Sequence, residues 1–215
     1  GTVFAIPMGL AARAADLVLY SPEPMAQQNH DLTLPAVSGI NGKIELSGGW
    51  LRIPPDDYGH VRLNGSLSVP VGDRFGLQGD LGVYNTPSGV GVSGALHAFT
   101  RDPDQYLLGI TAGFVRVPGA TLVAIGPEAE LYMGDFTLEA WAGFAHLDYE
   151  DALMTDVSGV YAIADLAYYV TPDFRLSIGG SHVLGYNQLR LAGEYQVTSF
   201  DFPFSVTGVL ISLNF

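Results

Sequence analysis

Four stretches of the chain share one pattern: VGDRFGLQGDLG (71–82), DPDQYLLGITAG (102–113), MGDFTLEAWAG (133–143) and TPDFRLSIGG (171–180). In each, a tight turn that contains aspartate is followed at once by an aromatic residue: Phe75, Tyr106, Phe136 or Phe174. The first three aromatics recur at nearly equal intervals, and the fourth follows after a longer gap. The regular interval of about 30 residues holds two strands and two turns, whereas propeller blades need about 40–45 residues each. The repeat therefore predicts an array of β-hairpins.

On both sides of these turns, apolar and polar residues alternate with period two from Lys43 onward. Such alternation is typical of strands whose two faces meet different surroundings. The pattern predicts strands near residues 43–53, 61–71, 75–86, 90–101, 106–117, 121–133, 136–147, 159–171, 174–184, 188–198 and 203–215. No helical stretch competes with them, so the expected fold class is all-β and antiparallel.

One face of the predicted strands is apolar and carries no charge, whereas the other face is polar. We predict that the charged members of the polar face line a lumen: Arg62, Asp80, Glu128, Glu130, Glu139, Asp165, Arg175, Arg190 and Glu194. Glu128 and Glu130, with Glu139 on the next strand, are the sharpest polar feature. They form a cation-attracting constriction in an open lumen, or they pair with arginines in a filled one. The sequence leaves both arrangements open.

The composition narrows the class of protein. The chain has 215 residues, which suits one domain, and its net charge of -13 argues against nucleic acid as a partner. Cysteine is absent, which excludes disulfides and thiolate chemistry. Charged residues make up only 14%, below the roughly 25% of soluble domains. No apolar run is long enough for a helix to span a membrane, so a helical span is not expected. These features favour a transmembrane β-barrel.

Two arrangements place one apolar and one polar face in a closed sheet. The apolar face points inward in a soluble, lipocalin-like carrier and outward in a membrane barrel. Short connections, strands of about 10–12 residues and sparse charge favour the membrane barrel. Aromatic residues directly after turns then lie where an interfacial belt is expected. We predict this belt to contain Phe75, Tyr106, Phe136, Phe174 and Phe204.

The chain ends in GVLISLNF (208–215), with Val209, Ile211, Leu213 and Phe215 alternating. This ending resembles the last strand of Gram-negative outer-membrane β-barrels, and the turn-plus-aromatic hairpins resemble their periplasmic turns. The resemblance covers roughly 43–215 and is generic to that superfamily. It implies location in the bacterial outer membrane, contact with the lipid bilayer and recognition by the barrel-assembly machinery through Phe215. An envelope protein is a further possible partner.

The number of strands poses a parity problem. Bacterial single-chain barrels have an even number of strands, and the apolar phase flips inside 203–215, from Phe204 and Val206 to Val209 and Ile211. We therefore expect a closed up-and-down barrel of about 12 strands, with a hairpin tip missing from the sequence between Val206 and Val209. A ten-stranded core is the second possibility, and a β-bulge is another way to absorb the flip.

The segment before Lys43 differs from the rest of the chain. Residues 1–15 resemble the rear of a secretory signal peptide, or else form a plug, and residues 16–42 read as an irregular lead-in. The barrel domain is expected over 43–215.

No motif for catalysis or cofactor binding emerges. The five histidines lack metal-ligand spacing, and adjacent Ser181 and His182 point to opposite faces of a strand. We therefore predict no enzyme, no cofactor and no metal site. The acidic loop 148–158 offers calcium ligands through Asp148, Glu150 and Asp151, but an ordinary solvated loop is the simpler interpretation.

Three functions are compatible with these patterns. The first is a porin-like barrel that passes small solutes or cations through an acid-rich lumen. The second is a filled barrel that acts through its loops or through an envelope partner. The third is the soluble carrier, which would need a more charged exterior than this sequence provides.

Overall fold

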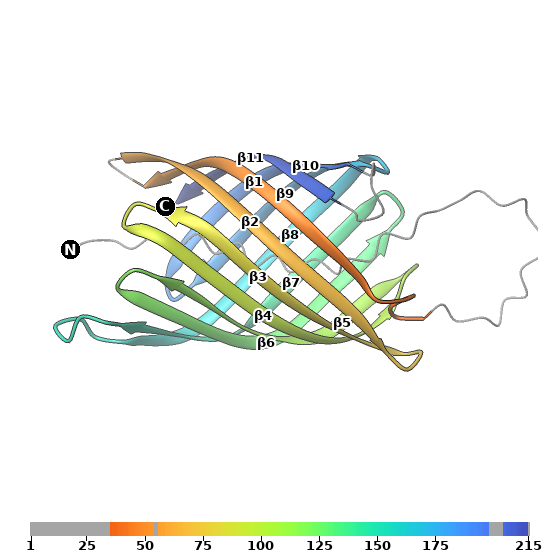
Figure 1. Cartoon of the computed structure of the whole chain (residues 1–215), viewed down its shortest axis with the longest axis horizontal. Coiled ribbons are helices and arrows are strands. Elements are labelled where there is room, and N and C mark those ends of the chain that lie inside the picture. Colours follow the sequence, from red (N-terminus) through yellow and green to blue (C-terminus); the bar gives the residue numbers. More distant parts are fainter. Residues whose placement is uncertain (1–34, 54–55, 198–203, 215) are drawn as a thin grey trace, which may run out of the picture.

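The structure is a computed structural model, and it describes residues 35–53, 56–197 and 204–214. These residues form eleven strands (Figure 1): β1 (Asn41–Ile53), β2 (Asp56–Val71), β3 (Phe75–Thr86), β4 (Gly89–Asp102), β5 (Tyr106–Val117), β6 (Ala120–Met133), β7 (Phe136–Tyr149), β8 (Val157–Thr171), β9 (Phe174–Val183), β10 (Tyr186–Val197) and β11 (Phe204–Asn214). Within the described ranges, no helix is long and apolar enough to cross a membrane.

Each strand pairs with the next one along the chain in antiparallel fashion, which makes an up-and-down sheet. β1 and β11 run in the same direction and pair in parallel, so the strand order returns to its start. Figure 1 shows the strands inclined to the long axis of a single curved layer. The predicted all-β, up-and-down fold is confirmed, and all eleven predicted segments correspond to strands, although several of these begin or end a few residues away.

The connections between the strands lie at two opposite ends of the molecule. The turn end holds the short turns at residues 72–74, 103–105, 134–135 and 172–173, which are the repeated turns of the sequence. The loop end holds the connections at 87–88, 118–119, 150–156 and 184–185. The connection at 150–156 is the longest of these, and it explains why the regular spacing of the repeat breaks between β7 and β8.

The expected strand number was wrong. The described residues form eleven strands, neither twelve nor ten, and β11 is one continuous strand that pairs with both β10 and β1. Its register against both neighbours shifts by one residue between Thr207 and Ile211. A bulge therefore absorbs the phase flip, so that Val206 pairs with Tyr195 and Ile211 with Leu191. No missing hairpin is needed.

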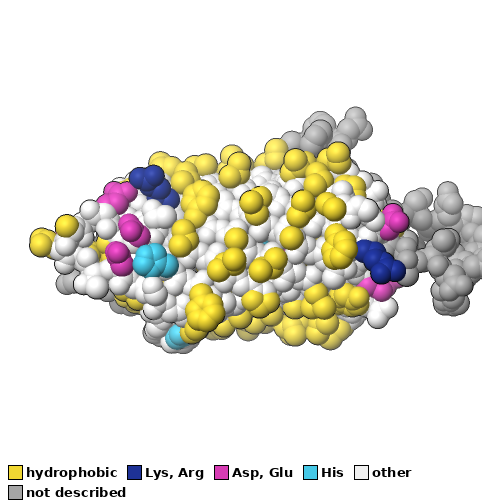
Figure 2. Space-filling model, turned by 90° about the horizontal axis from the view of Figure 1, so that it is seen from below, with side chains coloured by type: hydrophobic (Ala, Val, Ile, Leu, Met, Phe, Trp, Pro, Cys, Tyr) yellow, Lys and Arg dark blue, Asp and Glu magenta, His cyan; other side chains and the backbone are white. Residues whose placement is uncertain are grey.

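The apolar face of the strands points outward. Leu81 and Phe144 expose 72% and 71% of their surface, and other members of this face are also exposed. These include Val61, Leu63, Leu67, Leu77, Val83, Leu96, Leu108, Ile110, Val123, Ile125, Leu138, Leu166, Leu176, Ile178, Leu189 and Leu191. In Figure 2 apolar side chains cover the middle of the visible face, and charged side chains gather toward its two ends. This is the reverse of a soluble domain, in which such residues are mostly inside.

The aromatics after the repeated turns lie on the outward face at the turn end. Phe75 and Phe136 are exposed, while Tyr106 and Phe174 are half-buried. The Phe136 ring packs against Tyr168 of β8, with 4.8 Å between ring centroids. Phe215 lies outside the described residues, and so does the side chain of Phe204.

The inward face is apolar near both ends. Toward the loop end, eleven buried side chains of β3 and β5–β9 form one cluster: Tyr84, Val115, Val117, Ala120, Leu122, Trp141, Ala145, Leu147, Tyr161, Ile163 and Val183. Toward the turn end, buried Val37 packs with Phe99 and Leu107. The Ala36 amide donates to the Asp73 carbonyl at 3.1 Å, which holds Ala36, just before β1, against the turn-end rim.

Two inward positions require glycine because neighbouring backbones approach closely. Gly143 of β7 faces Gly126 of β6, next to Pro127, and regular pairing between the two strands is interrupted here. A Cβ added at Gly143 would overlap the backbone of Ile125, and one at Gly126 would overlap that of Ala142.

We expect Gly143→Ala to lower the free energy of unfolding by about 1–3 kcal/mol, because the new methyl group forces two strands apart. Gly65→Ala is the matched control, since a Cβ there meets nothing within 4 Å. The midpoint of urea unfolding measures both changes. An equal midpoint for the two variants would contradict the close approach.

Candidate functional site

The candidate site is the layer of charged side chains on the inward face, between the two apolar clusters. Strand alternation builds it: in β6, Glu128 and Glu130 are buried, whereas Leu131 next to them is exposed on the outside. The other predicted lumen residues occupy inward positions of the same kind on β2, β3 and β7–β10. They are less than half exposed, and Glu139, Asp165 and Arg175 are the most deeply buried, at 4%, 3% and 5%.

Two arginines pair with carboxylates two strands away. Arg175 of β9 donates to Glu139 of β7, and Arg190 of β10 donates to Asp165 of β8. Arg175 also lies 3.8 Å from Glu194 of β10, measured from Nη1 to Oε2. Its guanidinium is 5.8 Å from the centroid of the Tyr169 ring. These pairs follow the inside of the wall and connect four neighbouring strands, β7 to β10.

His97 of β4 is the centre of a second group. Its Nδ1 lies 2.7 Å from Glu128 Oε2, and its Nε2 lies 2.9 Å from Asp80 Oδ2. Glu128 also accepts hydrogen bonds from Thr111 Oγ1 at 2.6 Å and from Trp141 Nε1 at 3.2 Å. His97 therefore bridges carboxylates of β3 and β6. This role of His97 was not predicted from the sequence, because Asp80 and Glu128 lie on other strands, far from it along the chain.

Three further charged residues join the layer and were missed. Lys43 Nζ lies 3.0 Å from Glu45 and 3.3 Å from Glu194, which connects β1 to β10. Arg101 lies over the Tyr132 ring, at 5.3 Å from its centroid. The sequence contained a signal for all three residues, because side chains two positions apart on a strand lie on the same face. Lys43 and Glu45 alternate in this way with the polar residues of their strand, and Arg101 lies four residues from His97 on the same face.

These additions change the expected charge balance of the layer. Six carboxylates and three arginines were predicted there, whereas the described residues contribute seven carboxylates and five Lys or Arg side chains. Arg62 hydrogen-bonds Asn64 and Ser93. Most carboxylates thus have a basic partner, as in the filled-lumen arrangement.

Three carboxylates nevertheless lie side by side across adjacent strands. Glu130, Glu139 and Asp165 are register partners on the adjacent strands β6, β7 and β8. Like charges directly opposite each other are unfavourable unless cations lie close by. Glu139 and Asp165 have Arg175 and Arg190, while Glu130 accepts a hydrogen bond from the Tyr132 hydroxyl at 2.8 Å.

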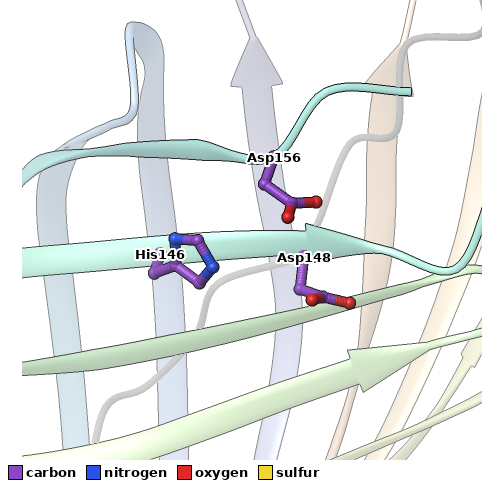
Figure 3. Close-up of side chains that lie close together, drawn as sticks. All are labelled: His146, Asp148 and Asp156. Atoms are coloured by element: carbon purple, nitrogen blue, oxygen red, sulfur yellow. The ribbon is translucent and has the colours of Figure 1, made fainter. Parts of the chain in front are cut away.

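The loop end does not assemble the calcium ligands that the sequence suggested. Glu150 pairs with Arg116 at 3.0 Å, and Asp151 accepts the amide of Leu153 within its own turn. Asp148 instead lies with His146 and Asp156, and the ligand atoms of these three are within 4.8 Å of one another (Figure 3). His182 contacts Asn187 at 2.8 Å and lies on the opposite face from Ser181.

The chain matches no known family model, no curated protein and no solved structure.

Proposed function

We propose that this chain is a transmembrane β-barrel of the bacterial outer membrane. The observation that carries the proposal is the reversed placement of its side chains, with Leu, Ile, Val and Phe outside and charge inside. Soluble monomers rarely expose contiguous apolar patches larger than a few hundred Å², whereas a bilayer requires such a belt. A soluble carrier would instead need its apolar face inward.

The resemblance to Gram-negative outer-membrane β-barrels also suggests how the chain would be assembled into the membrane. The resemblance implies that the barrel-assembly machinery recognises such a chain through its last strand, which would be β11 (Phe204–Asn214) here. β11 pairs with β10 and β1, so it is the strand whose addition completes the sheet. In the outer membrane the turn end would face the periplasm and the loop end the exterior.

Within this class, we propose a filled barrel that acts through its loops or an envelope partner. Arg175 and Glu139 are almost fully buried and bonded to each other, and so are His97 and Glu128. Side chains along a wide aqueous pore would instead remain accessible to water. The apolar clusters toward both ends give further support to this proposal.

A narrow porin-like channel is the second candidate. The row formed by Glu130, Glu139 and Asp165 favours it, because a ring of carboxylates attracts cations into a pore. Under this alternative, the ion pairs line a constriction.

Single-channel recording distinguishes the two candidates. The chain is folded in detergent, its folding is verified by heat-modifiable gel migration, and it is inserted into a planar bilayer under a KCl gradient. We expect insertion without steady openings, because paired side chains occupy the lumen.

Steady cation-selective openings would instead favour the channel. Glu128→Gln with Glu130→Gln would then lower cation preference, and Glu150→Gln, an exposed loop-end carboxylate, would leave it unchanged. A chain that stays in solution without detergent, and never inserts, would contradict both candidates.

A further inference from the structure

Outside the layer of charged side chains on the inward face, three metal-ligating side chains come together at the base of the loop at 150–156. His146 and Asp148 come from the end of β7, and Asp156 comes from the residue just before β8. Figure 3 shows the three side chains gathered at the point where the hairpin opens into its loop. Their ligand atoms lie within 4.8 Å of one another, so small side-chain rotations bring all three onto one ion.

The neighbouring residues already orient two of these ligands. His146 Nδ1 lies 2.8 Å from the Ser158 hydroxyl, which leaves Nε2 for an ion. Metal-binding histidines commonly engage their second ring nitrogen in this way. Asp156 Oδ1 accepts the Tyr149 amide at 3.1 Å, so its other oxygen remains for coordination.

The position of the cluster suits a site in contact with water. His146 and Asp148 follow Phe144 on the outward face, farther toward the loop end. Phe144 is the last apolar residue of that face on β7. The two aspartates are exposed, so an ion has direct access to them.

We propose that His146, Asp148 and Asp156 bind one divalent transition-metal ion. One imidazole and two carboxylates form a ligand set that Zn²⁺ accepts, with water in the fourth position. Calcium and magnesium are disfavoured because they prefer oxygen ligands throughout. Bound metal ties the end of β7 to the start of β8 and closes the base of the longest loop. The proposal does not depend on whether the lumen is filled or open.

Isothermal titration of the folded, detergent-solubilised chain with ZnCl₂ tests the site. We expect one high-affinity site, at least a tenfold loss of affinity in His146→Ala and in Asp156→Asn, and no competition from millimolar Ca²⁺. Ser158→Ala is expected to weaken binding by about 10–100-fold, as is usual when a residue that orients a ligand is lost.

His182→Ala is the matched control, because His182 is another exposed loop-end histidine with a polar neighbour, Asn187. It is expected to bind zinc like the wild type. The proposal is overturned if zinc does not bind, if His146→Ala binds as the wild type does, or if His182→Ala loses as much affinity as His146→Ala. Circular dichroism of each variant establishes that the β-structure is intact.

Discussion

Replacing Leu81 with arginine is expected to weaken folding into a lipid bilayer by about 2–4 kcal/mol. Leu81 lies near the middle of β3 on the outward face and is 72% exposed. In a membrane barrel this position faces hydrocarbon, where a guanidinium loses its hydration. In a soluble protein, the same exposed position would tolerate arginine within about 0.5 kcal/mol. Urea unfolding from phosphatidylcholine vesicles, followed by tryptophan fluorescence, measures the difference.

Val90→Arg is the matched control for this experiment. Val90 is 66% exposed on the same face, but it lies beside the turn at 87–88 at the loop end. There the cost falls to about 0–1 kcal/mol, because arginine reaches the polar interface. Equal and small effects at both positions would contradict the membrane proposal. Equal and large effects would place the bilayer boundary beyond Val90.

Removing the guanidinium of Arg175 is expected to have the second large effect on the stability of the folded chain. We expect Arg175→Met to lower the free energy of unfolding by about 3–5 kcal/mol, because it leaves the Glu139 carboxylate buried without its cation. Both side chains of the pair are nearly inaccessible, at 6% and 5%. Adding Glu139→Gln to Arg175→Met is expected to recover much of the loss, since no buried charge then lacks its partner. The midpoint of urea unfolding in vesicles reports both variants.

The exposed pair at the loop end provides the comparison. The side chains of Arg116 and Glu150 are 62% and 52% accessible, and Arg116→Ala is expected to cost only about 0–1 kcal/mol. If Arg175→Met were as mild as Arg116→Ala, water would have to reach Glu139. That result would argue for an open lumen and for the channel candidate.

Much of the fold was predictable because the relevant signal is local. A side chain two residues along a strand returns to the same face, so short windows around Phe75 or Phe136 reveal both the strand and its apolar side. Glu128 and Glu130 could be placed on the polar face for the same reason. The aspartate-containing turns mark where each hairpin reverses, which is also a short-range property.

The errors arose where distant strands meet. The phase flip between Val206 and Val209 is visible in the sequence, but a bulge and a missing hairpin produce the same flip. Only the continuous pairing of β11 with β10 and β1 distinguishes them. The excess of lumen carboxylates was overestimated for a different, local reason: Lys43, Glu45 and Arg101 share the parity of the polar face, but the prediction did not include them.

The cluster of His146, Asp148 and Asp156 was also missed because its members are separated in the sequence, although by fewer residues. His146 and Asp148 are close in sequence, but Asp156 joins them only because the hairpin folds back on itself. A search for fixed histidine spacing therefore does not find the group. The loop residues Glu150 and Asp151 looked equivalent to Asp148 in sequence, yet they point to other partners.

The sequence by itself determined the all-β class, the eleven strand segments and the two faces of each strand. The tertiary structure decided which face points outward, how the first and last strands meet and which charges pair. The physical reason is that alternation is encoded every two residues along one strand. Charge partners such as Arg175 and Glu139 are 36 residues apart in the chain, so their contact depends on the register of several strands at once.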